Sequence, residues 1–226
     1  MRLRPLAASV AVLALPLVTA ACGGDDETAA DVTGASVECA YPAGGSAAKD
    51  VEPPAGEASA EGETSATITT DQGDVPITLD RADAPCTVNS FVSLAEQGYF
   101  DGTTCHRLTS YDGLEVLQCG DPSGTGAGGP GYSFADELDA LDTTAATVPY
   151  PAGTLAMANA GADTNGSQFF LVYGDSELPP AYTQFGTVSA DGLAVVEQVA
   201  AGGSNDAQGV DGAPNRPVTI TGVSVD

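Results

Sequence analysis

The residue types that usually carry enzyme chemistry are sparse in this 226-residue chain. The single histidine, His106, invites a triad with Ser110 or Ser167 and a nearby aspartate. Alternation along a predicted strand at 103–109 turns His106 away from the face of Arg107, which favours a structural histidine whose ring nitrogens are hydrogen-bonded. The cysteines include no Cys-x-x-Cys pair and have no metal-ligand spacing, so a zinc site is not expected.

A run of glycines resembles a phosphate-binding loop: Gly124, Gly126, Gly128, Gly129 and Gly131. Their spacing is not Gly-x-Gly-x-x-Gly, no Lys-Ser or Lys-Thr follows them, and Pro130 interrupts the run. We therefore expect a tight loop packed beside a functional site, not a nucleotide site.

Arg107 is the more informative side chain, because its guanidinium stays protonated and can only donate hydrogen bonds. After residue 21 the chain has only three other basic residues, Lys49, Arg81 and Arg216. On composition alone, the simplest interpretation of Arg107 is a strand arginine paired with one of the many carboxylates. Its sequence context, described below, favours a chemical role.

The stretch 153–173 lacks ordinary catalytic residues but has a distinctive pattern. Small residues at 154–158 predict a strand whose backbone another chain can approach closely. Aromatic and β-branched residues at 168–173 predict a second strand, joined to the first by a turn at 160–166. This pattern is suited to holding a peptide.

The elements that would position these residues are many short strands and two helices. Helical spacing occurs at 87–97, with Thr87 as the expected cap, and at 193–200. Strand patterns occur at 67–70, 75–79, 103–109, 114–118, 154–158, 168–173, 184–188 and 218–225. This combination predicts an all-β dominated fold, a closed antiparallel barrel with two helices.

The charge balance is strongly acidic, with 6 Lys plus Arg against 31 Asp plus Glu and a net charge of -25. Such a charge repels a phosphate backbone, which excludes nucleic acid as an expected partner. Solubility is the simplest purpose of this charge, and attraction of basic clients is the alternative.

Three segments together resemble the cyclophilins, the cyclosporin-binding family of peptidyl-prolyl isomerases: 104–107 (Thr-Cys-His-Arg), 118–126 and 153–173. The resemblance spans 65–226 and implies an eight-stranded antiparallel barrel capped by two helices. It also implies rotation about the bond before proline, without a cofactor. Amide resonance opposes that rotation with a barrier of about 18–20 kcal/mol. A cation directed at the prolyl nitrogen would stabilise the twisted state more than the planar state.

The resemblance assigns catalysis to Arg107 and the orientation of Arg107 and the substrate carbonyl to Gln118. Asn159 matches a residue whose backbone binds the substrate chain, and Phe170 matches the wall of the proline pocket. The implied substrate-binding residues are Leu114, Glu115, Val116, Met157, Ala158, Asn159, Ala160, Gln168, Phe170, Leu178, Pro179 and Tyr182.

The pocket departs from the family pattern on one side. The connection between Arg107 and Gln118 is three residues longer than usual, so the family's Phe-Met pair falls among 114–116. Leu178 stands in place of a rim tryptophan, Pro179 in place of a leucine and Tyr182 in place of a histidine. Loss of the tryptophan N–H donor predicts that cyclosporin binding is weakened.

The N-terminus has the features of an export signal. Arg2 and Arg4 precede an apolar run at 5–21, which ends in small residues before Cys22. This start is similar to a bacterial lipoprotein signal and predicts a signal peptide at 1–21, a lipid on Cys22 and a place on the extracytoplasmic face of the cell membrane. An uncleaved transmembrane anchor and ordinary secretion are the alternatives.

Residues 22–64 are rich in Gly, Ala, Pro and acidic residues, and Tyr41 is their only aromatic residue. Such a composition predicts a flexible, acidic tether before the isomerase domain at 65–226. Cys39 is the anomaly in this segment and a candidate for pinning the tether to the domain.

Cys39, Cys86, Cys105 and Cys119 are an even number in an exported chain, which predicts disulfides and leaves three connectivities open. If Cys105 and Cys119 lie on the two arms of one hairpin, they are symmetric about Asp112 and could form a bridge. The family places Arg107 and Gln118 on one face, so this pairing would require a bulge within 110–114.

The sequence thus predicts a monomeric peptidyl-prolyl isomerase that acts on Xaa-Pro bonds of exported proteins and assists their folding. The main alternative is a proline-peptide-binding chaperone or scaffold on the same fold with little turnover. A purely structural surface lipoprotein is the third possibility, which the retention of Arg107 and Gln118 disfavours.

Overall fold

A computed structural model describes residues 34–226, which lie in one compact unit of the chain. The predicted signal peptide at 1–21 and the predicted lipid site, Cys22, lie outside the described residues. Within 34–226, no helix is both long and apolar enough to cross a membrane. The same residues contain no cluster of three side chains arranged to hold a metal ion.

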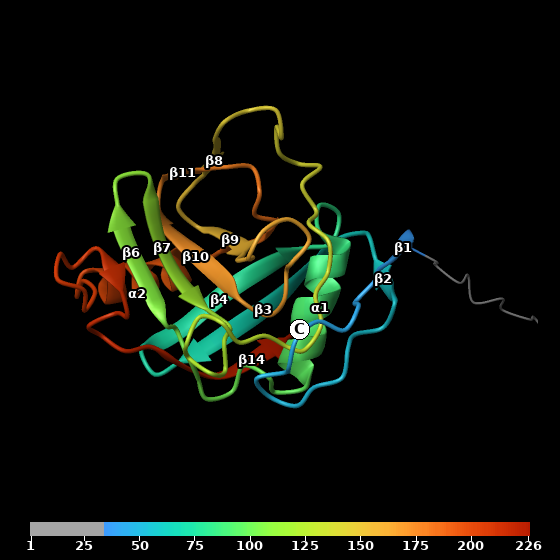
Figure 1. Cartoon of the computed structure of the whole chain (residues 1–226), viewed down its shortest axis with the longest axis horizontal. Helices are drawn as coiled ribbons and strands as arrows, with labels where there is room; N and C mark the ends of the chain where they lie inside the picture. Colours follow the sequence, from blue (N-terminus) through green and yellow to red (C-terminus); the bar gives the residue numbers. More distant parts are fainter. Residues whose placement is uncertain (1–33) are drawn as a thin grey trace, which may run out of the picture. The chain divides into compact units, whose positions relative to one another are not determined.

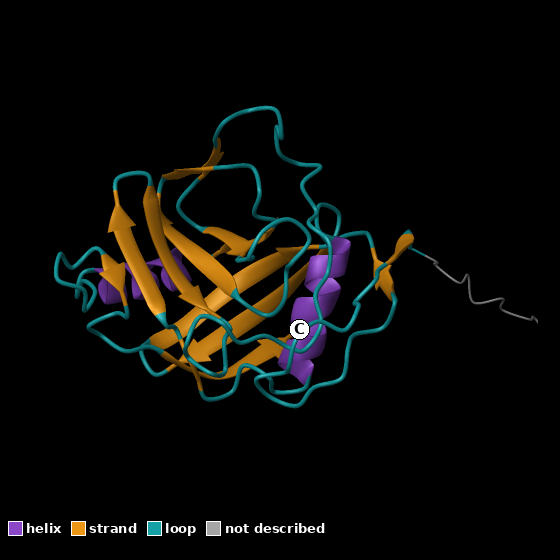
Figure 2. Ribbon diagram, viewed as in Figure 1, coloured by secondary structure: helices purple, strands orange, loops and turns teal. Residues whose placement is uncertain are grey.

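Short strands and two helices make up the described chain (Figures 1 and 2). In chain order they are β1 (Ser36–Glu38), β2 (Glu57–Ser59), β3 (Glu63–Thr70), β4 (Gly73–Asp80), α1 (Pro85–Glu96), β5 (Thr103–Thr104), β6 (Arg107–Tyr111), β7 (Leu114–Cys119), β8 (Val148–Tyr150), β9 (Thr154–Met157), β10 (Phe169–Gly174), β11 (Ser176–Leu178), β12 (Gln184–Val188), α2 (Ala190–Ala200), β13 (Asp211–Gly212) and β14 (Thr219–Val225).

The main sheet is antiparallel and curls into a half-barrel (Figure 2). Its strand order is β13-β6-β7-β10-β9-β12-β4-β3-β14-β5, and all its strands except β5 and β13 have four or more residues. Only Cys105 and His106 separate β5 from β6, so one extended segment pairs with β14 at its start and with β7 at its end. The predicted β-dominated fold with two helices is confirmed.

Aromatic and aliphatic side chains fill the inside of the curled sheet. Phe91 of α1 packs against Phe100, Phe169 and Phe185, with ring centroids 5.2 to 5.5 Å apart. At the other side, Val196 and Val199 of α2 are buried in the same core. Each helix thus buries one apolar face in the core.

The two helices begin differently. Ser189 caps α2 by accepting a hydrogen bond from the backbone N–H of Gly192. Thr87, the expected cap of α1, lies inside that helix, which begins at Pro85. The Glu137 carboxylate accepts hydrogen bonds from the N–H groups of Cys86 and Thr87 instead, so a distant residue satisfies these helix donors.

Residues 34–64 depart from the expected flexible tether. We call residues 39–52 the strap, because this segment runs beside α1 (Figure 1). Cys39 forms a disulfide with Cys86, as a pin of this segment would. Tyr41 donates a hydrogen bond to the carbonyl of Cys86 and packs edge-on against Phe134. The composition of the segment, rich in Gly, Ala, Pro and acidic residues, did not reveal these few anchors.

The far end of the strap is held as well. The ammonium group of Lys49 donates hydrogen bonds to the carbonyls of Gly98, Tyr99 and Asp101, just after α1 ends. The backbone N–H of Glu52 bonds to the amide oxygen of Gln97, whose amide nitrogen donates back to the Glu52 carbonyl. One of the few cations in the chain therefore fixes the strap to the domain.

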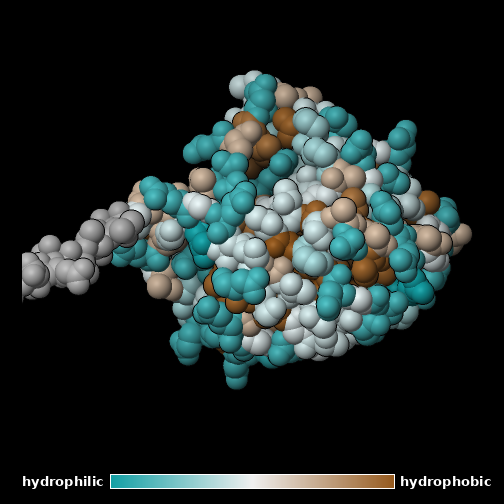
Figure 3. All heavy atoms as spheres, turned by 180° about the vertical axis from the view of Figure 1, so that it is seen from behind, coloured by the Kyte–Doolittle hydropathy of each residue, from teal (hydrophilic) through white to brown (hydrophobic). Residues whose placement is uncertain are grey.

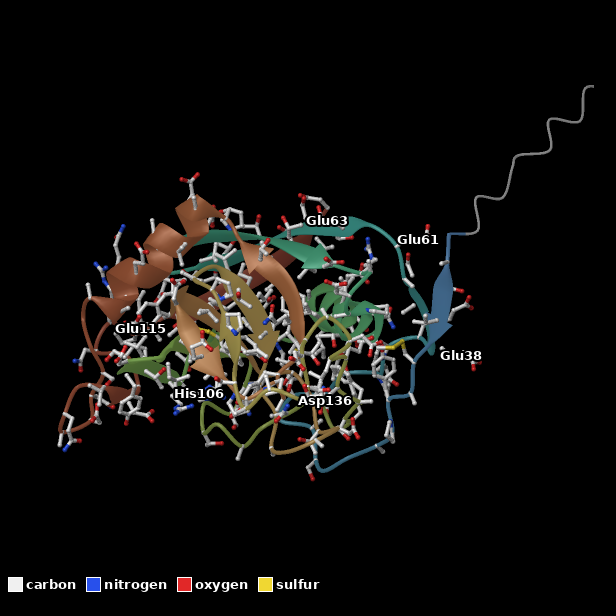
Figure 4. All side chains as sticks on the ribbon, turned by 90° about the horizontal axis from the view of Figure 1, so that it is seen from above. Glu38, Glu61, Glu63, His106, Glu115 and Asp136 are labelled. Carbon is white, nitrogen blue, oxygen red and sulfur yellow. A yellow bond between two sulfur atoms is a disulfide. The ribbon has the colours of Figure 1, made fainter. Side chains whose placement is uncertain are left out.

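The surface of residues 34–226 exposes few large apolar side chains. Hydrophilic and intermediate residues cover most of the face in Figure 3, and hydrophobic residues appear there as small, separate patches. Glu38 and Glu61 lie at the end of the domain that carries β1 and β2, away from His106 and Glu115 (Figure 4). Tyr111 is the exposed large apolar residue among the described residues, with 44% of its surface accessible.

Candidate functional site

Arg107 and Gln118 face each other across the β6–β7 hairpin. The register pairs Arg107 with Gln118 and Tyr111 with Leu114, so Asp112 and Gly113 form a tight turn. Directly opposed residues of an antiparallel pair point to the same face of the sheet. The bulge expected within 110–114 is therefore wrong, because the hairpin pairs regularly through its turn.

The irregularity lies instead at Cys105 and His106, where the extended chain passes from β5 to β6. The N–H of Cys105 bonds to the Val218 carbonyl, whereas the N–H of His106 bonds to the Gln118 carbonyl. This local change of partner brings Cys105 beside Cys119, and the two form a disulfide. The bridge joins the segment that carries Arg107 to the strand that carries Gln118.

A chain of side-chain hydrogen bonds connects Arg107 to the glycine loop. Nη1 of Arg107 lies 3.5 Å from Oε1 of Gln118. Gln118 donates through Nε2 to Oε1 of Gln168 at 2.9 Å. Gln168 in turn donates to the carbonyls of Gly126 and Gly128, both at 3.0 Å. These bonds fix the orientation of both glutamine amides.

Asp211 holds the other side of the Arg107 guanidinium. Nε of Arg107 lies 2.7 Å from Oδ1 of Asp211, and Nη2 lies 2.9 Å from Oδ2. The hydrogen bonds from Arg107 lower the pKa of Asp211, and the same bonds raise the pKa of Arg107. Sequence reasoning missed Asp211, which is 104 residues from Arg107 and has no local motif.

A cavity of about 300 Å³, with apolar side chains on one side and polar ones on the other, opens beside the Arg107–Gln118 pair. The residues that line it are Arg107, Leu114, Val116, Gln118, Ala158, Asn159, Phe170, Leu178 and Tyr182. Phe170 contributes a buried ring that lies 5.7 Å from the ring of Tyr182. All nine had been assigned to the site from the sequence, so the structure brings most of the expected residues together.

Five of the expected residues do not line this cavity. Glu115 alternates with its neighbours on β7, and its carboxylate lies close to Gly174. Met157 is buried in the main core, and Pro179 is exposed. Ala160 and Gln168 line a neighbouring groove instead.

Tyr150 is a cavity-side residue that sequence reasoning missed. It is fully buried in the cluster with Phe170 and Leu178. Its hydroxyl donates to the carbonyl of Tyr182 at 2.9 Å and also lies 3.3 Å from the Tyr182 N–H. Tyr150 therefore fixes the segment that carries Tyr182. Its strand, β8, has only three residues, too few to give a periodic signal.

The neighbouring groove has a volume of about 320 Å³ and shares Gln118, Ala158 and Asn159 with the cavity. Its other lining residues come from the glycine loop and the two residues after it, Tyr132 and Ser133, from 160–168 and from the strap at 44–46. The N–H groups of Gly44 and Ala48 donate to carbonyls of the glycine loop. The expected packing of that loop beside the site is present, and the strap adds a wall that the sequence did not predict.

Asp121 anchors the glycine loop. Its buried carboxylate accepts hydrogen bonds from the N–H groups of Ser123, Gly126 and Gly128 and from the Ser123 hydroxyl. Burial alone would raise the pKa of the Asp121 carboxyl, but these hydrogen bonds outweigh burial and hold the pKa below its usual value. The ionised form is therefore the one that the fold stabilises.

We expect Asp121→Asn to lower the free energy of unfolding at pH 7 by about 1–3 kcal/mol, because a buried acceptor is lost. The folded pKa of Asp121 is lowered, so its contribution is complete above the ordinary aspartate pKa of about 3.9 and declines as the pH falls through the folded value. Urea unfolding at several pH values tests this. Asp112→Asn, at an exposed position, is the matched control. If the difference in unfolding free energy between the wild-type protein and Asp121→Asn did not change with pH, the stabilising role of the ionised Asp121 would be refuted.

His106 does not line the cavity, as strand alternation predicts, but the expectation that its ring nitrogens are hydrogen-bonded is wrong. Burial lowers the pKa of its imidazole, and the ring lies against Gly126. Among the described residues neither imidazole nitrogen has a hydrogen-bond partner. The hydroxyl of Ser167 donates to the Gly120 carbonyl instead. A Ser-His-Asp triad is therefore not formed.

Known proteins resemble this chain in both sequence and fold. The family model "Cyclophilin type peptidyl-prolyl cis-trans isomerase/CLD" matches residues 65–225. A probable peptidyl-prolyl cis-trans isomerase B of Mycobacterium tuberculosis is 54% identical over 171 residues, which cover 73% of this chain and 55% of that protein. A protein of the same name from Mycobacterium leprae is 51% identical over 204 residues, covering 86% and 68%. The chain thus spans about half the length of the M. tuberculosis relative.

A solved structure of a Cryptosporidium parvum cyclophilin-type isomerase is 28% identical, with a TM-score of 0.59, and covers 73% of this chain and 98% of that chain. The C. parvum protein was also solved in the presence of the dipeptide Ala-Pro, and that structure gives a TM-score of 0.58 and 29% identity, with 72% and 98% covered. These matches extend over most of the described domain. The chain belongs to the cyclophilin-type peptidyl-prolyl cis-trans isomerase family.

Proposed function

We propose that the cavity beside Arg107 accelerates cis-trans isomerisation of Xaa-Pro peptide bonds. The observation that carries this proposal is the placement of a guanidinium and an oriented amide at the edge of a cavity of about 300 Å³ that Val116, Phe170 and Leu178 also line. The cavity walls suit a proline ring, and the C. parvum relative was solved with a proline dipeptide. The reaction makes and breaks no covalent bond, so it needs no nucleophile.

The residues divide this work between binding and charge stabilisation. Phe170, Val116 and Leu178 would hold the proline ring by burying apolar surface. As the amide twists, the prolyl nitrogen regains its lone pair, and the Arg107 cation would donate to it. This interaction is stronger in the twisted state than in the planar state, which is the condition for catalysis.

We further propose that the clients are exported proteins and that the domain works on the extracytoplasmic face of the membrane. The support is the signal-like sequence at 1–21, the lipid-acceptor position of Cys22 and the two disulfides of the domain. Disulfides persist in oxidising compartments outside the cytoplasm. Mass spectrometry of the mature protein tests this: a chain that begins at Cys22 with added lipid supports it, and an unmodified chain that begins at Met1 contradicts it.

Cyclosporin should bind weakly to this domain. Leu178 lines the cavity at the position where the family has a rim tryptophan, and an aliphatic side chain offers no N–H donor. Because the chain has no tryptophan at all, isothermal titration is preferable to intrinsic fluorescence. We expect a dissociation constant well above the nanomolar range, and a nanomolar dissociation constant would show that the rim donor is unnecessary.

A further inference from the structure

The loop between α2 and β14 places a carboxylate on the outer side of Arg107. Two residues of this loop form β13 and pair with β6, Asp211 opposite Thr109 and Gly212 opposite Leu108. The N–H of Ser110 adds a hydrogen bond to the Val210 carbonyl. The loop is therefore docked along the strand that carries Arg107.

The loop is also braced internally, close to Asp211. The Asp206 carboxylate accepts hydrogen bonds from the Ser204 hydroxyl and from the N–H groups of Gln208 and Asp211. These bonds lower the pKa of Asp206 to about 2, the Ser204 hydroxyl being the largest cause. Asn205 accepts from the N–H of Ala213 in the same turn. Hydrogen bonds within the turn therefore fix the position of Asp211.

The geometry of the pair leaves Nη1 as the guanidinium nitrogen that Asp211 does not contact. Asp211 occupies Nε and Nη2 in a two-point contact, while Nη1 faces Gln118. Arg107 and Gln118 both line the cavity, whereas Asp211 does not. We propose that Asp211 is a positioning residue that holds the guanidinium so that Nη1 is directed at the substrate. This inference rests on the proposed isomerase function of the cavity.

The pair is poorly suited to a purely stabilising role. The side chains of Arg107 and Asp211 are 39% and 30% exposed, and exposed ion pairs contribute little to stability. A planar guanidinium held at two points, however, loses much of the rotational freedom of a long side chain. The contact therefore serves mainly to orient the Arg107 guanidinium before the substrate binds.

The test compares Asp211→Asn with the wild-type protein in a peptide isomerisation assay. Asn has the same shape as Asp but cannot accept two bonds from the guanidinium. We expect kcat/KM to fall about tenfold, mainly through kcat, since a charge-assisted contact is lost. The melting temperature and peptide affinity should change little. Asp112→Asn, which removes an exposed charge from the turn of the same hairpin, is the matched control and should retain full activity.

Two outcomes would overturn the positioning role. The Asp211 carboxylate also partly neutralises the positive charge of Arg107. An increase in kcat in Asp211→Asn would show that this neutralisation slows the reaction more than the fixed orientation of the guanidinium speeds it. Unchanged kcat would show that the pair does not matter. A double-mutant comparison adds a stricter condition: in an Arg107→Ala background, Asp211→Asn should have no further effect, because Asp211 acts only through Arg107.

A spectroscopic measurement separates this inference from the proposed function. In the wild-type protein, the Arg107 Nε–H proton should exchange slowly with solvent, because it is bonded to Asp211. The exchange should become fast in Asp211→Asn. A wild-type protein with no isomerase activity would refute the proposed function, and the exchange rate would then decide the positioning role alone. Identical exchange rates in the two proteins would refute that role.

Discussion

Arg107→Ala should reduce kcat/KM for a proline peptide by roughly 10²–10³-fold, the range seen when a single preorganised donor to a developing charge is removed. Arg107 is the cation that lines the cavity, and Gln118 and Asp211 fix its orientation. The apolar walls remain in the variant, so peptide affinity should fall by much less than turnover.

Isomerisation rates and peptide titrations on the same preparation measure both quantities. Arg81→Ala is the matched control, because it removes an arginine that does not line the cavity and should leave activity unchanged. Equal turnover in Arg107→Ala and in the wild-type protein would refute the assigned role. A parallel loss of binding and turnover would instead make Arg107 a binding residue only.

Replacing Cys39 and Cys86 by serine should lower the free energy of unfolding by about 4 kcal/mol, because the bridge closes a loop between cysteines 47 positions apart. The same double substitution at Cys105 and Cys119, 14 positions apart, should cost about 3 kcal/mol. The larger loss is expected for the bridge that holds the strap, because it excludes more conformations of the unfolded chain.

Urea unfolding of the oxidised proteins measures both differences. Hydrogen exchange adds a local measurement, since the N–H groups of Gly44 and Ala48 bond to the carbonyls of Gly131 and Gly129. When the Cys39–Cys86 bridge is removed, the exchange rates of these two protons should rise more than the exchange rates of the N–H protons of β3 and β4. Unaltered protection of Gly44 and Ala48 would show that Tyr41 and Lys49 hold the strap without the disulfide.

The parts of the fold that follow from local pattern were predictable. The strand at 184–188 has the predicted bounds, and both helices lie within a few residues of the predicted ranges. These elements have apolar spacing that only one secondary structure can bury. Strands of two or three residues, such as β1, β8 and β13, have too few positions to show a period.

The site was predictable where the chain keeps the motifs of the family it resembles. Arg107, Gln118 and Phe170 lie on β6, β7 and β10, whose pairing places them side by side. Asp211 was not predictable, because its contact with Arg107 depends on a loop that docks far from it in sequence. The assignment of Glu115 to the site was avoidable, because alternation along the strand from Gln118 puts Leu114 and Val116 on the face of Gln118 and Glu115 on the opposite face.

The strap shows why average composition misjudged residues 34–64. A disulfide, the hydroxyl of Tyr41 and the ammonium group of Lys49 hold this segment, and three such residues change its average composition little. Because 44–46 line the groove beside the cavity, functional assays should retain the strap. A protein truncated at residue 65 would lack that wall.

The most direct test of the account is a protease-coupled isomerisation assay with a proline peptide and a protein of residues 34–226. Uncatalysed exchange takes tens to hundreds of seconds, so catalysis is easily resolved. We predict a rate that rises in proportion to protein concentration and is lost in Arg107→Ala. A wild-type protein that binds the peptide without accelerating its isomerisation would contradict the account and identify a proline-peptide-binding module on a cyclophilin fold.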